Sequence, residues 1–198
     1  MGVFADQVAS DAYKRQKAAE TARMIQSARN ANPDAPITLM GLSAGTAVAV
    51  FTLEALPQNC RVDNVVLLGA SISDDYDLTQ ALKRVNGRMY VFTSENDAVL
   101  NFAVPLAGTA DRQAGSDPSA GLNGFVVPAG APLETRRLYS KVTNVAWRTS
   151  FEQDGDFGGH TDTTQPRFVR DHIAPIVMQE GPQRVHPNWR VAQSGASR

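Results

Sequence analysis

The stretch that decides the fold spans residues 37–56 and reads ITLMGLSAGTAVAVFTLEAL. Its first part, Ile37–Met40, is a short apolar run that predicts a β-strand, and residues 44–56 are apolar nearly all round, which predicts a buried helix. The turn between them carries the pattern G-x-S-x-G at Gly41 to Gly45. A strand, a sharp turn and a buried helix in this order indicate one unit of an α/β fold.

Strand and helix patterns alternate on both sides of this unit. Further strands are predicted over residues 64–70, 89–93 and 142–148, and helices over residues 5–30, 77–84 and 168–178. The continuous apolar run at 64–70 is typical of a parallel strand that is covered on both faces. Pro175 is expected to kink or shorten the last helix. The chain is therefore predicted to be α/β, with a mainly parallel sheet of about four strands flanked by helices.

The composition fits one globular domain and excludes some classes of partner. The chain has 198 residues, of which 42% are hydrophobic and 20% charged, as in an ordinary single domain. We expect that domain to span residues 1–180, with a Gly- and Pro-rich loop or cap insertion near 101–135 and a polar C-terminal tail over 181–198. The net charge of −1 argues against nucleic acid as a partner.

The sequence also bears on membranes and compartment. Residues 35–53 carry no charged side chain, but their glycines and Pro36 divide the run into a strand, a turn and a helix rather than a membrane span. The first residues lack a basic segment followed by an apolar run, so no signal peptide is predicted. The single Cys60 cannot form an internal disulfide. As the sequence stands, we expect a cytoplasmic protein without a membrane span.

Ser43, in the middle of the turn, is the candidate nucleophile, and a serine nucleophile needs a base. The chain has three histidines. His160 lies in the Gly-rich segment 156–162, after the last predicted strand, and loops at a sheet edge often carry functional residues. His172 lies in the predicted last helix, where a surface or packing role is simpler, and His186 lies in the polar tail. His160 is therefore the preferred base.

A histidine base is oriented by a carboxylate, and Asp97 is the preferred candidate. It follows the strand at 89–93, which brings it to the same carboxyl edge of the sheet as Ser43. The alternatives follow the strand at 64–70 and are Asp74, Asp75 and Asp77. The chain order of nucleophile, acid and base is then Ser43, Asp97, His160.

The residues around the turn have expected roles as well. Gly41 and Gly45 are expected to leave room where the strand and the helix approach closely. Ala44 begins the helix, and its N–H is the candidate oxyanion-hole donor for negative charge that develops on a bound carbonyl.

These segments, GLSAG at 41–45, SEND at 94–97 and GGH at 158–160, resemble the α/β-hydrolase superfamily, in particular its esterase- and lipase-like serine hydrolases. The resemblance implies that Ser43 attacks a small-molecule acyl substrate, that His160 acts as general base and that Asp97 orients it. It implies an acyl-enzyme that water then hydrolyses, with no metal and no organic cofactor. A peptidase, a thioesterase or a transferase would use the same triad.

The resemblance is incomplete before the turn. Superfamily members usually place several strands there, whereas this sequence shows one helix and no HG-rich loop for a second oxyanion donor. We therefore expect a chain that lacks the N-terminal half of the sheet and leaves the strand at 37–40 on an edge. Such an edge could pair with a second copy in a homodimer. The alternative function is a non-catalytic or shortened hydrolase-like domain with a binding or assembly role.

Overall fold

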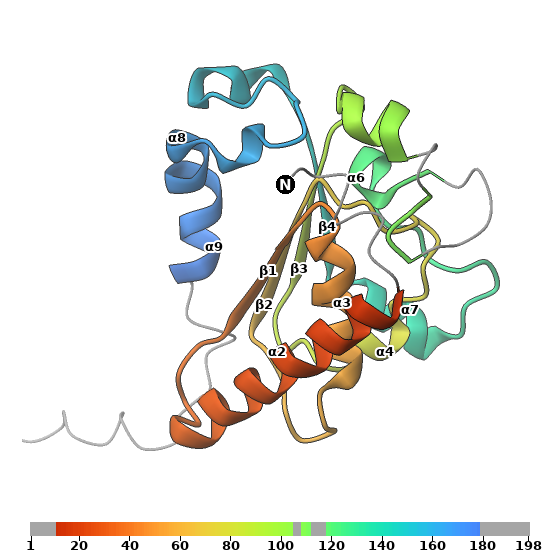
Figure 1. Cartoon of the computed structure of the whole chain (residues 1–198), viewed down its shortest axis with the longest axis vertical. Coiled ribbons are helices and arrows are strands. Elements are labelled where there is room, and N and C mark those ends of the chain that lie inside the picture. The colour runs from red at the N-terminus through yellow and green to blue at the C-terminus, as the bar shows by residue number, and fades with distance from the viewer. Residues whose placement is uncertain (1–10, 105–107, 112–117, 179–198) are drawn as a thin grey trace, which may run out of the picture.

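The computed structural model describes residues 11–104, 108–111 and 118–178, and its centre is a four-stranded parallel sheet (Figure 1). The strands are β1 (Thr38–Leu42), β2 (Asn64–Leu68), β3 (Met89–Thr93) and β4 (Val142–Ala146). They lie in the order β1-β2-β3-β4, and every neighbouring pair is parallel. The predicted α/β fold with a parallel sheet is confirmed.

Helical segments cover both faces of the sheet. One face carries α2 (Asp11–Ala31), α3 (Gly45–Ala55), α4 (Thr79–Leu82) and α7 (Leu133–Tyr139). The other carries η2 (Thr149–Asp154), α8 (Pro166–Phe168), η4 (Val169–Ile173) and α9 (Ala174–Met178). Figure 1 shows α8 and α9 on the opposite side of the strands from α2 and α3.

Burial on both faces explains why β2 is apolar throughout. Val65 and Leu67 point into the larger core beneath α2 and α3, whereas Val66 and Leu68 point into the smaller core beneath α8 and α9. All five residues of β2 are buried, since the strand lies between β1 and β3 inside the sheet. Helix α3 is apolar nearly all round because it packs between the sheet and α2.

Strand β1 lies at one edge of the described sheet, as expected, with Met40 44% and Leu42 36% exposed. Both side chains lie on the face that α8 and α9 cover farther along the sheet, because Met40 pairs in register with Val66 and Leu42 with Leu68. Pairing of this edge with a second copy stays a prediction. Among the described residues, no helix is both long and apolar enough to cross a membrane.

Several predicted boundaries differ from the structure. The strand predicted over 64–70 ends at Leu68, because Gly69 adopts φ +50° and turns the chain. The strand predicted over 142–148 ends at Ala146, and the helix predicted over 77–84 forms only at Thr79–Leu82. The last helix continues past Pro175 to Met178, with π-helical geometry in η4 just before the proline, which has no N–H to donate.

The Gly- and Pro-rich region contains short helical pieces in its described parts. These are the π-helical turn η1 (Val99–Ala103) and α6 (Ala120–Asn123), followed by α7. Residues 105–107 and 112–117 lie outside the described residues. So do residues 5–10 of the first predicted helix and the whole predicted tail at 181–198.

Candidate active site

Ser43 occupies a strained turn between β1 and α3. Its φ of +53° makes it the one non-glycine residue with a left-handed backbone in the described parts of the chain. The Ser43 N–H donates to the Leu68 carbonyl at 2.9 Å, and the Ser43 carbonyl accepts from the Thr46 N–H at 2.9 Å and from the Thr46 hydroxyl at 2.5 Å. Such a conformation costs about 1–3 kcal/mol and persists only where its surroundings hold it, as these three bonds do here.

The two glycines of the turn do not play the same part. A Cβ on Gly41 would lie 2.6 Å from the Gly45 carbonyl oxygen and 2.9 Å from Thr46 Cα, so Gly41 allows β1 and α3 to approach, as predicted. A Cβ on Gly45 would meet no atom within 4 Å, so the same prediction for Gly45 is wrong. The physical reason is direction: Gly45 contributes its backbone to the close contact, while its side-chain position faces open space.

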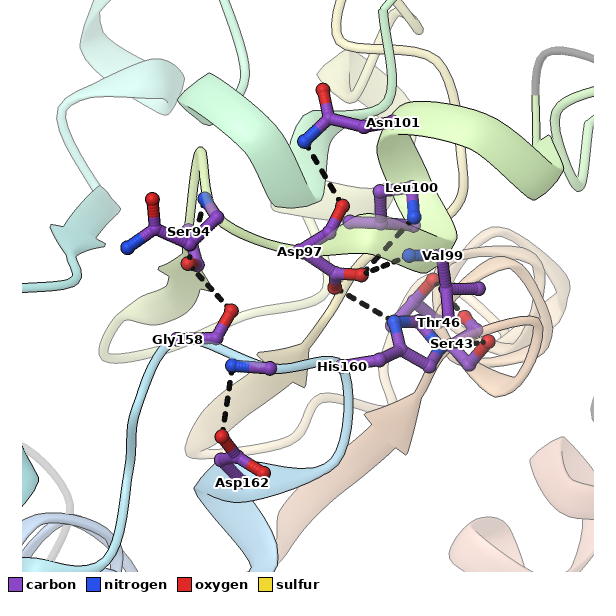
Figure 2. Close-up of polar contacts among 12 residues, drawn as sticks. Ser43, Thr46, Ser94, Asp97, Val99, Leu100, Asn101, Gly158, His160 and Asp162 are labelled. Atoms are coloured by element: carbon purple, nitrogen blue, oxygen red, sulfur yellow. Dashed lines mark hydrogen bonds and ion pairs between the residues drawn. The ribbon is translucent and has the colours of Figure 1, made fainter.

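His160 links Ser43 to Asp97 in one chain of hydrogen-bonding groups (Figure 2). His160 Nε2 lies 2.8 Å from Ser43 Oγ, and His160 Nδ1 lies 2.7 Å from Asp97 Oδ2. The imidazole and the carboxylate are both buried, with 9% and 2% of their residue surface exposed. The structure therefore brings together all three residues that the sequence singles out, at hydrogen-bond distance.

The Asp97 carboxylate is fixed by the backbone that follows it. Its Oδ1 accepts from the Val99 N–H at 2.9 Å and from the Leu100 N–H at 3.0 Å, at the start of η1. The other oxygen, Oδ2, remains for His160. Two backbone donors on one oxygen hold the carboxylate in the orientation that the imidazole needs.

The competing candidates take other partners. Asp77 accepts from the N–H and the hydroxyl of Thr79, the first residue of α4. His172 Nε2 lies 2.9 Å from Asp154 Oδ2, and its ring packs against the rings of Phe151 and Phe168, so of the surface and packing roles expected for it the structure shows packing. Neither Asp74 nor Asp75 is the partner of His160 Nδ1, which is Asp97, and His186 lies outside the described residues.

The loop that carries His160 is held by two further carboxylates, those of Asp156 and Asp162, which were not among the predicted site residues. Asp156 Oδ1 accepts from the Gly158 N–H at 2.8 Å, and Asp162 Oδ2 accepts from the Gly159 N–H at 2.9 Å. Burial raises the pKa of the Asp156 carboxyl above its usual range. Short-range Asp-to-backbone bonds are the ordinary consequence of Asp beside glycine in a turn, so the pattern DFGGHTD could have indicated them.

Two features complete the surroundings of the triad. Ala44, the candidate oxyanion donor, is buried at the start of α3, where N–H groups lack partners within the helix and the dipole is positive. A small pocket beside these residues is lined by His160 and Asp97 together with Trp147 and Phe151. Ser43 is not among the residues that line this pocket.

A comparison with protein families gives one match to the chain. The family model described as alpha/beta hydrolase matches residues 2–107, more than half of the 198 residues, and the match includes Ser43 and Asp97 but ends before His160. Searches of curated proteins and of solved structures returned no significant match. With the strand order and the strained turn at Ser43, the match shows that this chain belongs to the alpha/beta hydrolase family.

Proposed function

We propose that the protein is a serine hydrolase that cleaves an ester of a small-molecule acyl substrate through an acyl-enzyme. The observation that carries the proposal is the hydrogen-bonded chain from Ser43 through His160 to Asp97, at 2.8 and 2.7 Å. These are the residue types and the contacts by which a hydroxyl is activated as a nucleophile.

The geometry supports a definite sequence of proton transfers. As Ser43 Oγ attacks the ester carbonyl, its proton passes to His160 Nε2, 2.8 Å away. His160 then protonates the departing alkoxide, so that the alcohol leaves and the acyl group remains on Ser43. In the second half, His160 takes a proton from water, the resulting hydroxide attacks the acyl carbon, and Ser43 Oγ leaves with that proton.

Asp97 acts through His160 in this scheme. Its buried carboxylate accepts from Nδ1–H, which leaves Nε2 unprotonated and directed at Ser43. The same contact stabilises the imidazolium that forms in each half-reaction, because charges interact more strongly away from water. The Ala44 N–H is proposed to stabilise the oxyanion, and loss of one such donor typically lowers kcat by about 10²–10³.

A serine-directed fluorophosphonate probe tests this assignment. The folded wild-type protein should be labelled and should hydrolyse p-nitrophenyl esters of short acids, whereas Ser43→Ala should do neither. Ser140→Ala is the matched control, because Ser140 is an exposed serine directly after the last residue of α7, and its hydroxyl donates to the Arg137 carbonyl. It should be labelled like the wild type.

The experiment also decides between the two functions that the sequence left open. Equal labelling of Ser43→Ala would refute the role of Ser43. A folded wild-type protein that is neither labelled nor active would favour the alternative, a hydrolase-like domain with a binding or assembly role. A panel of esters, thioesters and peptides then separates ester hydrolysis from the other reactions of the same triad.

A further inference from the structure

We propose that Ser94 is a positioning residue, which locks the loop bearing Asp97 to the loop bearing His160 and so sets the distance between acid and base. The proposal rests on the proposed function, because it concerns the same triad. Its evidence is a contact between two loops that lie 64 positions apart in the sequence.

The Ser94 hydroxyl connects the two loops directly (Figure 2). Ser94 follows the last residue of β3, and its Oγ–H donates to the Gly158 carbonyl at 2.8 Å. The same oxygen accepts from the Asn96 N–H at 3.2 Å. Gly158 is two residues before His160, and Ser94 is three residues before Asp97, so one hydroxyl joins both loops close to the residues that must meet.

The backbone of Ser94 is held in place by hydrogen bonds to two other residues. Its N–H donates to the Gly121 carbonyl at 2.8 Å, and the Gly121 N–H donates to the Ala70 carbonyl at 2.7 Å. Its own carbonyl accepts from the Asp97 N–H at 3.2 Å. The backbone of Ser94 is thus tied to the loop after β2 on one side and to Asp97 on the other, which lets its side chain act as a rigid anchor.

The other partner, Gly158, is held just as closely. It adopts φ +85°, and a Cβ there would lie 2.8 Å from Ser94 Oγ and 3.1 Å from Asn96 Cβ. Its N–H donates to Asp156, so both polar groups of the residue are occupied. The two loops therefore pack closely at Gly158, two residues before His160, so loss of the Ser94 contact should loosen the segment that carries the imidazole.

A simpler interpretation is that Ser94 only closes the turn after β3, through its bond from the Asn96 N–H. The two interpretations differ in what the hydroxyl controls. A turn-closing serine affects stability alone, whereas a serine that locks the loops also affects the Asp97–His160 hydrogen bond. A displacement of reacting groups by about 1 Å can lower a rate by about 100-fold, so a loosened loop should be visible in the chemistry.

The test compares Ser94→Ala with Ser140→Ala, which also removes a hydroxyl bonded to a backbone carbonyl, at 2.7 Å. Ser140 lies just before the amino end of β4, whereas the triad follows the carboxyl ends of the strands. Ser94→Ala should lower kcat and the rate of probe labelling by about 10- to 100-fold with little change in KM. The low-field proton NMR signal of His160 Nδ1–H should shift or broaden. Ser94→Thr, which keeps a hydroxyl, should restore both, and Ser140→Ala should change neither.

The proposal would be overturned if Ser94→Ala kept the wild-type kcat, labelling rate and His160 Nδ1–H signal. It would also be overturned if Ser140→Ala lost as much activity as Ser94→Ala. Thermal unfolding establishes that each variant is folded. If Ser94→Ala does not fold, Ser94→Cys gives the same comparison, because a thiol fills the space but donates weakly. The NMR signal does not depend on turnover, so an inactive wild-type protein would count against the proposed function while the Ser94 contact is still measured.

Discussion

The two glycines of the turn should respond in opposite directions to the same substitution. In Gly41→Ala the new Cβ would lie 2.6 Å from the Gly45 carbonyl oxygen and 2.9 Å from Thr46 Cα, well inside the 3.4 Å at which ordinary contact begins. Every one of these neighbouring atoms belongs to the backbone, so no side chain can rotate out of the way. In Gly45→Ala the new Cβ meets nothing within 4 Å.

The expected magnitudes follow from these distances. Overpacking a buried site usually costs about 1–3 kcal/mol, and a contact that only backbone movement can relieve belongs at the upper end, so we expect Gly41→Ala to lose about 3 kcal/mol. Gly45 is the first residue of α3, and its φ is not positive. Alanine is preferred to glycine in a helix by about 0.5–1 kcal/mol, so Gly45→Ala should gain about 0.5 kcal/mol.

Urea unfolding of the wild type and both variants measures these changes directly. The midpoint should fall for Gly41→Ala and rise slightly for Gly45→Ala, with similar slopes for all three proteins. Fluorophosphonate labelling of the folded fraction then shows how far the turn has moved in Gly41→Ala. If both substitutions destabilise the protein equally, or if Gly41→Ala leaves the unfolding midpoint unchanged, the close contact between β1 and α3 at Gly41 is refuted.

Two further predictions concern the loops around the imidazole. Gly69→Ala places a Cβ 3.2 Å from His160 Nδ1 at φ +50°, whereas the Cβ of Gly130→Ala, at φ +70°, meets no atom within 4 Å. Both variants should lose stability through backbone strain, but only Gly69→Ala should slow probe labelling, by about tenfold or more. Equal labelling rates in the two variants would contradict this prediction. Because burial raises the pKa of Asp156, the folded protein binds its proton to higher pH than the unfolded chain does, so stability falls as pH rises through the interval between the two pKa values. Asp156→Asn keeps an acceptor for the Gly158 N–H but does not titrate, so its unfolding free energy relative to the wild type should rise with pH in that interval. Denaturant unfolding from acid to neutral pH measures this difference, and a difference that stays constant with pH would refute the prediction.

Much of the fold was predictable because its signals are local. The apolar runs that predict β1 to β4 lie where the strands form, and the unbroken run of β2 correctly indicates burial on both faces. The meeting of Ser43, Asp97 and His160 was predictable for a related reason. Each follows a strand, and parallel strands bring their carboxyl ends to one edge of the sheet, so the loops after β1, β3 and β4 converge.

Other features depend on tertiary packing and leave no local signal. The bond from Ser94 to Gly158 joins residues 64 positions apart, and neither residue type indicates the other. The predicted strand at 64–70 extends two residues beyond β2, because Gly69 and Ala70 continue the apolar run although φ +50° at Gly69 ends the strand. The pattern G-x-S-x-G also does not distinguish its two glycines, whereas in the structure only Gly41 has neighbouring atoms where a Cβ would lie.

The carboxyl end of β2 explains why the triad is so closely constrained. The Leu68 carbonyl accepts from the Ser43 N–H at 2.9 Å, and the next residue, Gly69, lies against the ring of His160 at a distance where a methyl group would be tight. Two consecutive residues at the end of an inner strand thus lie beside the proposed nucleophile and the proposed base. Ser94 fixes the base from the other side, through Gly158. The imidazole therefore has the end of β2 beside its ring and the Ser94 contact two residues before it in the chain, so substitutions at Gly69 and at Ser94 test the same geometry through two separate contacts.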